Sequence, residues 1–375
     1  MIVIFVSFVQ NDAHRWPGYR YCRKSLTTVS GTHAPTSFCS GDVIFKDNFE
    51  RINFKVWKHE NTLSGGGNWE FQWYTNNRSN SFTKDGLLFI KPTLTSDVIG
   101  EEKLSQIELD VNGFTQADYC TDKRFYGCVR KGTREHIVNP VRSAKITTQN
   151  SFAFKYGRVE IRAKMPTGDW LWPALWFLPE DNVYGPWAGS GGIILAESRG
   201  NEHFTEKDIN IGSEQIESLL HWGPDVTHDG YLKTRFFKRS PGKPFNKSFR
   251  KYQMEWTPES IKFSIDGKEY GVVRPNKTFW ELGEFKTTDK DNPWIYGTKF
   301  APFDEEFYLI INLAVGGIAY FTDEATNFPP KPWSNRSPKA ATDFWDGRQG
   351  WLRTWNLKEN DNAALQIDYV RIWAL

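Results

Sequence analysis

The stretch that decides the fold lies in the middle of the chain. Residues 168–179 read GDWLWPALWFLP, and residues 192–201 follow as GIILAESRGN. From Val43 onward the chain consists of short strand-like runs, and turn-forming residues separate them. This pattern indicates an all-β protein, because no helical stretch of three or more turns stands out and no internal repeat is visible.

Five further segments carry clear strand or hairpin signals. An Asp-Gly pair next to an alternating apolar run is the strongest short-range signal for a hairpin, and period-two alternation indicates a half-buried strand. The sequence therefore predicts a two-sheet β-sandwich or jelly roll, in which the final strand returns beside an early one and a concave sheet forms a groove for a linear polymer. The five segments are 87–90 after Asp85-Gly86, 158–164 after Tyr156-Gly157, 261–265 before Asp266-Gly267, 307–315, and 366–373.

Composition narrows the functional classes. Lys and Arg total 47 and Asp and Glu total 45, so the near-zero net charge argues against a nucleic-acid or polyanion binder. Aromatic residues make up 16% of the chain and include 17 Trp. Most of these rings are expected in the core, but indole rings also stack on the apolar C–H faces of sugars. The composition is therefore compatible with carbohydrate binding.

The cysteines and the glycosylation sequons suggest a secreted protein. Four cysteines allow three pairings, and we expect the two that close local loops, which would be disulfides in an oxidising compartment. Four Asn-x-Ser/Thr sequons support the same compartment. The expected disulfides are Cys22–Cys39 and Cys120–Cys128, and the sequons lie at Asn77, Asn246, Asn276 and Asn335.

The start of the chain divides into three parts. Residues 2–9 are apolar but are shorter than the roughly 20 residues that a membrane-spanning helix needs. Residues 1–13 are therefore expected to be a signal peptide or an incomplete amino terminus. Residues 14–41 are expected to be a Cys-containing linker, and residues 42–375 one large domain. We expect no membrane span, since no other apolar run approaches the necessary length.

Four segments together resemble family 16 glycoside hydrolases. They are 168–179, 197–201 (ESRGN), 220–224 (LHWGP) and 312–317 (NLAVGG), and the resemblance covers roughly residues 41–375. Within that family the chain resembles the invertebrate Gram-negative-bacteria-binding and β-1,3-glucan recognition proteins.

The resemblance implies a fold, a ligand and partners. The fold is a concanavalin A-like jelly roll with a concave glucan-binding groove. The implied function is that of a secreted pattern-recognition protein that binds β-1,3-glucan of microbial cell walls in innate immunity. Lipopolysaccharide as a further ligand and serine-protease cascade components as partners are implied in the same way. The small glucan-binding module that usually precedes the linker in these proteins is not found in this sequence, as expected of a shortened relative or of an incomplete start.

The carboxylates of the family's catalytic strand are largely missing. The family pattern is Glu-Ile-Asp-Ile-Met-Glu-Ser-Arg-Gly-Asn, whereas this chain has Gly192 at the first Glu and Ile194 at the Asp. Retaining glycosidases need two carboxyl groups about 5–5.5 Å apart. Residues i and i+2 share a face of a strand, and a bulge would bring residue i+5, here Glu197, to that face. We therefore predict negligible hydrolysis, with Glu197 as a remnant acid that binds a sugar hydroxyl or braces Arg199.

Other groove residues follow from the resemblance, each with a packing alternative. Trp187 would stack on a sugar or anchor its loop, and His221 and Trp222 match a pair that lines the groove in relatives. Arg199 and Asn201 would bind hydroxyls or fix their loop. Trp172 and Trp170 are expected to share one face, which is either groove or core. No metal site and no cofactor are expected, because the seven His are scattered without zinc-like spacing.

Two rival hypotheses remain open. The first is an active endo-β-1,3-glucanase in which Asp169, Glu180 or Glu202 replaces the nucleophile; it requires a second carboxylate within about 6 Å of Glu197. The second is a degenerate scaffold without glucan affinity, in which Ile194 and neighbouring loops fill the groove.

Overall fold

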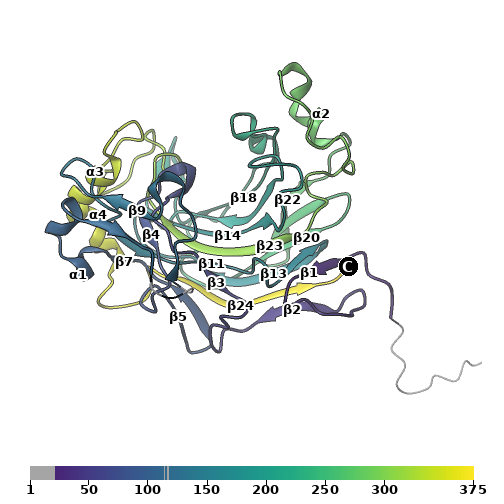
Figure 1. The fold of residues 1–375 in the computed structure, drawn as a ribbon, viewed down its shortest axis with the longest axis horizontal. Helices are drawn as coiled ribbons and strands as arrows, with labels where there is room; N and C mark the ends of the chain where they lie inside the picture. The colour runs from purple at the N-terminus through teal and green to yellow at the C-terminus, as the bar shows by residue number, and fades with distance from the viewer. Residues whose placement is uncertain (1–21, 114, 116–117) are drawn as a thin grey trace, which may run out of the picture.

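Most of the strands of this chain stack in two large sheets (Figure 1). The computed structural model describes residues 22–113, 115 and 118–375, so the expected signal segment at residues 1–13 lies outside the described residues. Within the described residues, one sheet has nine strands and the other eight. We call them the front sheet and the back sheet.

The front sheet has the strand order β1-β12-β23-β14-β15-β18-β19, and β11 pairs with both β23 and β3. All of its pairings are antiparallel. Its strands are β1 (Thr28–Ser30), β3 (Lys58–His59), β11 (Lys145–Thr147), β12 (Ala153–Lys155), β14 (Leu171–Pro179), β15 (Gly192–Glu197), β18 (Gln215–His221), β19 (Phe236–Arg239) and β23 (Phe307–Val315).

The back sheet has the order β22-β21-β20-β13-β24-β6-β5, and β2 pairs with β24. Its strands are β2 (Val43–Asp47), β5 (Ser81–Lys84), β6 (Leu87–Ile90), β13 (Gly157–Lys164), β20 (Arg250–Trp256), β21 (Ile261–Ile265), β22 (Lys268–Val273) and β24 (Leu365–Trp373).

Smaller elements gather at the two ends of the sandwich. Figure 1 shows α1, α3 and α4 together at one end with β4 and β9, whereas α2 stands at the other. The small strands are β4 (Gln72–Tyr74), β7 (Thr93–Leu94) and β10 (Val141–Ser143) in one sheet, β8 (Glu108–Asp110) with β9 (Val129–Lys131), and β16 (Thr205–Glu206) with β17 (Ile209–Asn210). The α-helices are α1 (Ser96–Ile99), α2 (Phe279–Gly283), α3 (Ala340–Asp346) and α4 (Arg348–Trp355), and the 3-10 turns are η1 (Gly66–Asn68), η2 (Glu102–Ser105), η4 (Arg124–Tyr126), η5 (Val226–His228), η6 (Tyr231–Thr234) and η7 (Phe285–Thr287).

The core lies between the two sheets and is rich in aromatic rings. Alternate residues of β13 (Val159, Ile161 and Ala163) are buried there, as period-two side-chain alternation requires. Trp256 of β20 packs edge-to-face on Phe154 and Phe307, with ring centroids 5.5 and 5.4 Å apart. Such aromatic pairs stabilise beyond the area they bury, which accounts for much of the high aromatic content.

The sequence-based strand predictions are confirmed. Segments 87–90, 158–164, 261–265, 307–315 and 366–373 all lie in strands of the back or front sheet. Both Asp-Gly pairs adopt positive φ, with 51° at Asp266 and 77° at Gly267, as a tight hairpin turn requires. The final strand, β24, lies between β13 and the early strands β2 and β6, as expected.

The expectation of a linker before residue 42 is wrong for residues 22–41. Strand β1 joins the edge of the front sheet through β12. The segment is also bonded to the end of the chain: the Ser25 hydroxyl donates to the Leu375 carbonyl at 2.8 Å, and Leu375 N donates to Thr27 Oγ1 at 2.9 Å. This part of the chain therefore belongs to the domain.

Both expected disulfides are confirmed. Cys22 is bonded to Cys39, and Cys120 is bonded to Cys128. Both close local loops, since the paired cysteines are 17 residues apart in the first disulfide and 8 residues apart in the second. The first fixes the segment that carries β1, and the second fixes the loop next to β9.

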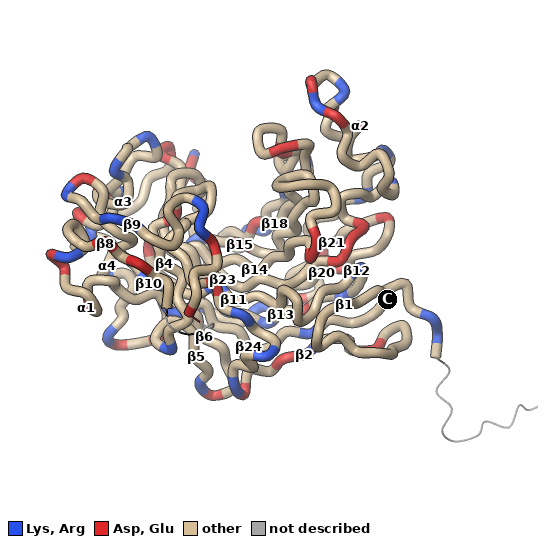
Figure 2. The backbone as a smooth tube through the Cα atoms, viewed as in Figure 1, with Lys and Arg blue, Asp and Glu red and all other residues tan. Residues whose placement is uncertain are grey.

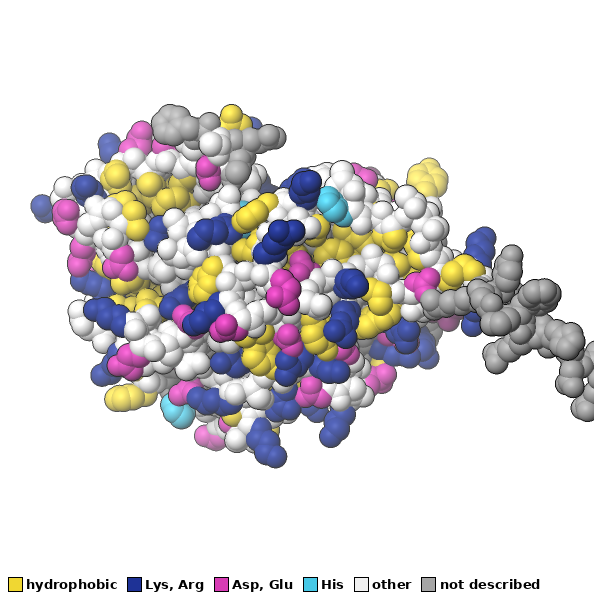
Figure 3. Space-filling view, turned by 90° about the horizontal axis from the view of Figure 1, so that it is seen from below, with side chains coloured by type: hydrophobic (Ala, Val, Ile, Leu, Met, Phe, Trp, Pro, Cys, Tyr) yellow, Lys and Arg dark blue, Asp and Glu magenta, His cyan; other side chains and the backbone are white. Residues whose placement is uncertain are grey.

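Charges of both signs are mixed over the molecule. Figure 2 shows Lys and Arg interspersed with Asp and Glu along the backbone, and Figure 3 shows the same mixture on the face that it presents.

Within the described ranges, no helix is long and apolar enough to cross a membrane.

Candidate functional site

The site is built on the outer face of the front sheet, which is the face turned away from the core. In β14, Leu171, Leu175 and Phe177 point into the core. The alternate residues Trp172 and Trp176 therefore point outward, and both are half-buried. The segment quoted first in the sequence thus supplies both core and outer face.

A β-bulge places Glu197 on the outer face. In β15, Ile193, Leu195 and Ala196 are core residues, so Ile194 and Glu197 point outward although they are three residues apart. The register of β15 shifts between Ile194 and Glu197 where it pairs with β18. An extra residue in one strand has this effect, because it reverses the alternation beyond it.

Strand pairing then creates a row of side chains across the outer face. Lys145 of β11 lies opposite Asn312 of β23, and Asn312 lies opposite Ala174 of β14. Ala174 lies opposite Glu197, which in turn lies opposite Glu217 of β18. Residues opposite one another in an antiparallel pair have Cβ atoms about 4.5–5.5 Å apart. Two carboxyl groups therefore stand side by side in this row.

Glu197 is buried and its proton is held tightly. Its Oε2 accepts a hydrogen bond from Trp172 Nε1 at 2.9 Å. Burial, and next the negative charge of Glu217, raise the pKa of Glu197 well above its usual value of 4.5, and the Trp172 bond and the charges of Arg199 and Arg235 offset this only in part. The raised pKa keeps Glu197 protonated in the folded protein at neutral pH. A protonated carboxyl group can donate a proton, but it cannot attack a sugar as a nucleophile.

Glu217 was missed by the sequence analysis. Its side chain is 3% exposed and forms an ion pair with Arg235, which donates from Nε to Oε1 and from Nη2 to Oε2, the latter at 3.0 Å. A bidentate guanidinium pair fixes the orientation of a carboxylate as well as its position. The signal was available as one acidic residue in the apolar strand QIESLLH, but only the bulge in β15 brings it opposite Glu197.

An indole ring occupies the space of the missing nucleophile. A Cβ atom added to Gly192 would lie 3.0 Å from Cζ3 and 3.2 Å from Cη2 of Trp187. The Trp187 ring also contacts His221, which lies opposite Gly192, with ring centroids 4.6 Å apart. Trp187 remains 38% exposed. A carboxylate at residue 192 therefore could not enter the site unless this ring moved.

His221 is held in place by a carboxylate and by a neighbouring aromatic ring. Its Nδ1 lies 2.6 Å from Oδ2 of Asp229, and its ring contacts Tyr231 at 5.4 Å between centroids. Asp229 Oδ1 also accepts the backbone N–H groups of Trp222 and Tyr231, at 3.2 and 3.1 Å. The site therefore combines Trp187 and His221 in one rigid contact.

The two tryptophans of residues 168–172 do not share a face, contrary to expectation. Trp170 precedes β14, has a positive φ of 67°, and is fully buried against Phe204, Phe321 and Trp333. Trp172 lies in the strand and stacks on Tyr320, with centroids 4.1 Å apart and planes at 8°. Alternation fails because the backbone between them is not extended.

Two of the expected groove residues lie in the interior, so their placement in the groove is wrong. Trp222 is 0% exposed, donates from Nε1 to Thr234 Oγ1 at 2.9 Å, and packs on Phe279. Asn201 is also buried; its Oδ1 accepts the Trp170 N–H at 3.0 Å. The residue after His221 in a strand points to the opposite face, which places Trp222 in the core.

Arg199 fixes a loop. Its guanidinium lies 3.8 Å from the centroid of the Tyr320 ring and donates from Nη2 to the Tyr320 carbonyl at 2.7 Å. A further bond runs from Nη1 to the Ile211 carbonyl at 3.1 Å. Tyr320 in turn stacks on Trp172, so Arg199 helps to fix the position of the Trp172 ring on the outer face.

Each of the three acids considered as replacement nucleophiles has a partner of its own. Asp169 is buried and accepts a hydrogen bond from Asn327 at 3.1 Å. Glu180 accepts the Asn150 N–H at 2.7 Å, and Glu202 forms an ion pair with Lys247. Each is thus engaged elsewhere.

The four sequons differ in exposure. Asn77 and Asn276 are exposed, so glycosylation there stays a prediction. Asn335 is half-buried and donates to the Phe321 carbonyl at 2.9 Å. Asn246 is buried at 3% exposure. This burial contradicts the expected glycosylation at Asn246, because a glycan attached there would have to pass through packed protein to reach solvent.

The part of the chain that the structure describes contains no group of three or more His, Cys, Asp or Glu side chains that could hold a metal ion. The chemistry of the outer face is therefore that of its aromatic rings and of the Glu197–Glu217 pair.

Comparisons with known proteins show what this chain is similar to. The family model of glycosyl hydrolases family 16 matches residues 116–291. A β-1,3-glucan-binding protein of Penaeus monodon is 46% identical over 341 residues, which cover 89% of this chain and 90% of that protein. The β-1,3-glucan-binding protein 1 of Galleria mellonella is 34% identical, over 94% of this chain and 67% of that protein.

Among solved structures, the laminarinase from Rhodothermus marinus has a TM-score of 0.54 and 23% sequence identity. The match covers 89% of this chain and 98% of that one. It supports the jelly-roll fold that the sheets already show.

The raised pKa of Glu197 predicts a pH-dependent stability. The folded state holds the Glu197 proton more tightly than the unfolded chain, so the free energy of unfolding should fall as the pH rises from 4.5 through the raised pKa. Glu197→Gln should remove this loss and be more stable than the native protein at the upper end of that window, by on the order of 1 kcal/mol or more. Denaturant unfolding at several pH values measures the difference.

The control for this experiment is Glu259→Gln, because Glu259 is exposed and far from the row. Its stability relative to the native protein should not vary with pH. A Glu197→Gln difference that stays constant across the window would contradict the assignment of a neutral Glu197.

A side chain added at residue 192 would contact the Trp187 ring, so substitutions at residues 192 and 187 should have non-additive effects on the free energy of unfolding. Gly192→Glu should destabilise the protein by about 1–3 kcal/mol, because the new side chain must displace the indole. The same substitution should cost less in a Trp187→Ala background. A double-mutant cycle by urea unfolding measures this coupling.

Phe82→Ala serves as the reference for this cycle, since Phe82 is a half-buried ring on the back sheet. Gly192→Glu should be additive with Phe82→Ala. Additivity with Trp187→Ala as well would show that the ring does not occupy the nucleophile's space.

Proposed function

Because the chain belongs to the family of invertebrate β-1,3-glucan-binding proteins, which are built on a glycosyl hydrolase family 16 fold, we propose that it binds β-1,3-glucan without cleaving it. The proposed binding surface is the outer face of the front sheet around Trp172, Trp176 and Trp187.

The absence of hydrolysis is supported by one observation above all. The Trp187 ring lies in tight contact with the place where a side chain of residue 192 would begin, and Ile194 replaces the acid between the two catalytic positions. Retaining hydrolysis needs an ionised nucleophile and an acid on opposite sides of the scissile bond. Glu197 can still act as a hydrogen-bond donor to a sugar hydroxyl, since it is protonated at neutral pH.

Sugar binding is supported by the rings that remain accessible. Trp172 and Trp176 are half-buried on the outer face, and Trp187 is 38% exposed. Trp176 Nε1 donates to Asn312 Oδ1 at 2.7 Å, and Lys145 Nζ lies 5.1 Å from the centroid of the ring, so the ring is fixed from its edge and from one face. Fixed aromatic rings bind ligands at little cost in conformational entropy. These rings count against a scaffold without glucan affinity, although Ile194 does fill part of the floor.

The biological setting is proposed from the family. We place the protein outside the cell, where its disulfides would persist. There it would recognise β-1,3-glucan of microbial cell walls as part of innate immunity and report it to serine-protease cascade components. Lipopolysaccharide is a further proposed ligand, since a related protein is named a Gram-negative bacteria-binding protein.

A second function, that of an active endo-β-1,3-glucanase, has one specific observation in its favour. Glu217 provides the second carboxylate beside Glu197 that this hypothesis requires. Against it stands the bidentate pair with Arg235, which holds both Glu217 oxygens away from a substrate. The non-catalytic function is therefore preferred.

Binding should depend on the outer-face indoles. Trp172→Ala and Trp187→Ala should each weaken binding to insoluble β-1,3-glucan by about fivefold or more, because each removes a ring on which a sugar can stack. Pull-down at several protein concentrations measures the affinity. Phe82→Ala on the back sheet is the matched control and should bind as the native protein does.

If both Trp variants bind as well as the native protein does while Phe82→Ala is also unchanged, the outer face is not the binding surface. A loss of binding in all three variants would instead point to a folding defect.

Hydrolysis should be negligible. The purified protein should release no more reducing ends from soluble β-1,3-glucan than its Glu197→Gln variant, since loss of one member of a catalytic unit typically costs about 10⁴-fold or more in rate. Release that both Glu197→Gln and Glu217→Gln abolish would favour the glucanase function, with Glu217 as the second carboxylate.

A further inference from the structure

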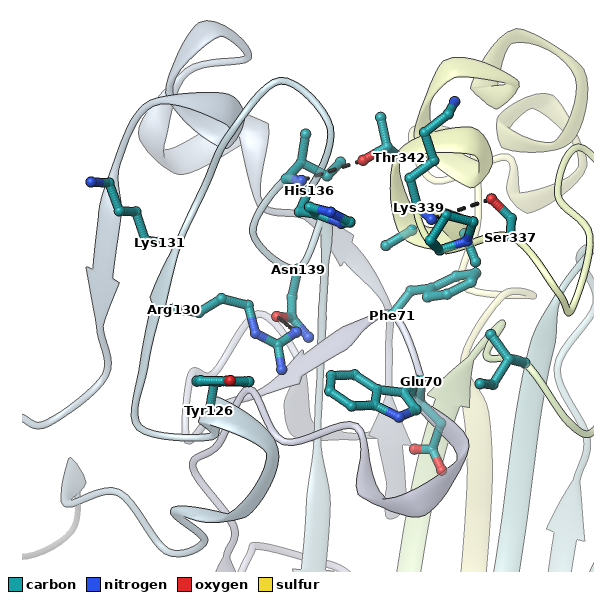
Figure 4. A pocket seen from close by; sticks show the side chains of 16 residues that line it. Glu70, Phe71, Tyr126, Arg130, Lys131, His136, Asn139, Ser337, Lys339 and Thr342 are labelled. Carbon is teal, nitrogen blue, oxygen red and sulfur yellow. Dashed lines mark hydrogen bonds between the residues drawn. The ribbon is translucent and has the colours of Figure 1, made fainter.

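A pocket opens at the end of the molecule that carries α3 and β9, next to the outer-face row, since its lining residue Glu70 lies near Lys145. It has a volume of about 670 Å³ (Figure 4). Pockets of this size hold small-molecule ligands or a few sugar residues. Its walls come from four parts of the chain: the turn before β4 with Trp69 and Phe71, the β9 hairpin with Arg130, Ile318 after β23, and the segment that enters α3.

Arg130 is the central polar group of this pocket. Figure 4 shows its guanidinium between Tyr126 and Asn139. Nη1 donates to Asn139 Oδ1 at 2.7 Å, and Nη2 donates to the Phe125 carbonyl at 2.8 Å. Asn139 is itself buried and donates to the Gln72 carbonyl at 2.8 Å. The position of the guanidinium is therefore fixed before any ligand binds.

The charge of Arg130 has no acidic partner among the described residues. Burial alone lowers the pKa of Arg130 to about 10, and no carboxylate offsets this effect. Arg130 is half-buried, and a carboxylate or phosphate that bound its free N–H groups would offset the cost of partly desolvating a guanidinium that has no counter-charge.

The other charged groups of the pocket leave this balance positive. Lys131 is exposed at its rim, and Lys339 is paired with Asp343. Glu70 is the acid of the lining, but burial raises its pKa, and Figure 4 shows its carboxyl turned away from the Arg130 guanidinium.

Exposed aromatic rings surround the guanidinium. Tyr126 is 72% exposed and Trp69 is 41% exposed. Trp69 contacts Phe125 edge-to-face, with centroids 5.6 Å apart, so the indole is held while one part of it remains accessible. Large exposed rings beside a preformed polar group mark a ligand site more than a packing contact. Rings of this kind suit the apolar C–H face of a sugar.

We propose that this pocket binds a sugar residue that carries an anionic group, with the anion on Arg130 and the sugar ring against Trp69 and Tyr126. The site goes beyond the neutral glucan of the outer face and would let the protein recognise acidic as well as neutral polysaccharides. The pocket and the outer face are connected by a short segment of sequence. The pocket residue Ile318 lies two residues before Tyr320, and Tyr320 stacks on Trp172 of the outer face.

Binding of four small probes tests this proposal: glucuronic acid, glucose 6-phosphate, glucose and inorganic phosphate. Ligand-observed NMR or calorimetry on the full chain should show both acidic sugars binding more tightly than glucose, and binding should weaken with added salt. Arg130→Gln should lower the affinity for the acidic sugars about tenfold or more, because charge-assisted hydrogen bonds are lost. Arg130→Lys should retain part of it.

Tyr126→Ala provides a second variant that does not endanger folding, since this side chain is largely exposed. It should weaken binding of the acidic sugars but not of inorganic phosphate. Preference for only one of the two acidic sugars would still support the proposal and would identify the anion as a carboxylate or a phosphate.

Three results would overturn the proposal: glucose binding as tightly as the acidic sugars, Arg130→Gln binding them unchanged, or inorganic phosphate binding as tightly as glucose 6-phosphate. Failure here is distinct from failure of the glucan function. Trp172→Ala should reduce glucan pull-down and leave acidic-sugar binding intact, whereas Arg130→Gln should do the reverse.

Discussion

The register of three neighbouring strands, β14, β15 and β18, determines what this protein can do on its outer face. The bulge between Ile194 and Glu197 turns Glu197 outward and sets it opposite Glu217. With one residue fewer, Glu197 would point into an apolar core, where a carboxyl group without a partner is costly. The hydrogen bond from Trp172 and the charge of Arg235 are arranged around this one backbone irregularity.

The same sheet carries the features on which the proposed lack of hydrolysis rests. Glycine at residue 192 leaves room, and an indole from a neighbouring loop fills it and contacts His221. The retained acid, Glu197, is buried beside a carboxylate that is itself committed to Arg235. The result is a set of fixed rings and one neutral carboxyl group, which suits hydrogen bonding to a sugar more than attack on it.

The loops at the end of the sandwich that carries α3 and β9 add a different kind of recognition. The outer face offers indoles and a protonated acid, whereas the pocket around Arg130 offers a fixed positive charge beside accessible rings. The two surfaces differ in charge and are built from different segments, so their contributions to ligand choice can be separated by single substitutions. A chain with almost equal numbers of acidic and basic residues can thus still hold a local site for an anion.

The sequence by itself determined the all-β fold, the two hairpin turns, the two disulfides and the loss of two acids from the catalytic strand. These features are local: alternation, Asp-Gly pairs, near neighbours along the chain and missing side chains can be read without knowing the pairing of distant strands. The tertiary structure alone decided that Trp222 and Asn201 are buried, that Glu217 stands beside Glu197, that Trp187 fills the space at Gly192, and that residues 22–41 join the sheet. Each of these depends on which strands pair and in what register, and a shift of one residue reverses every side chain in a strand.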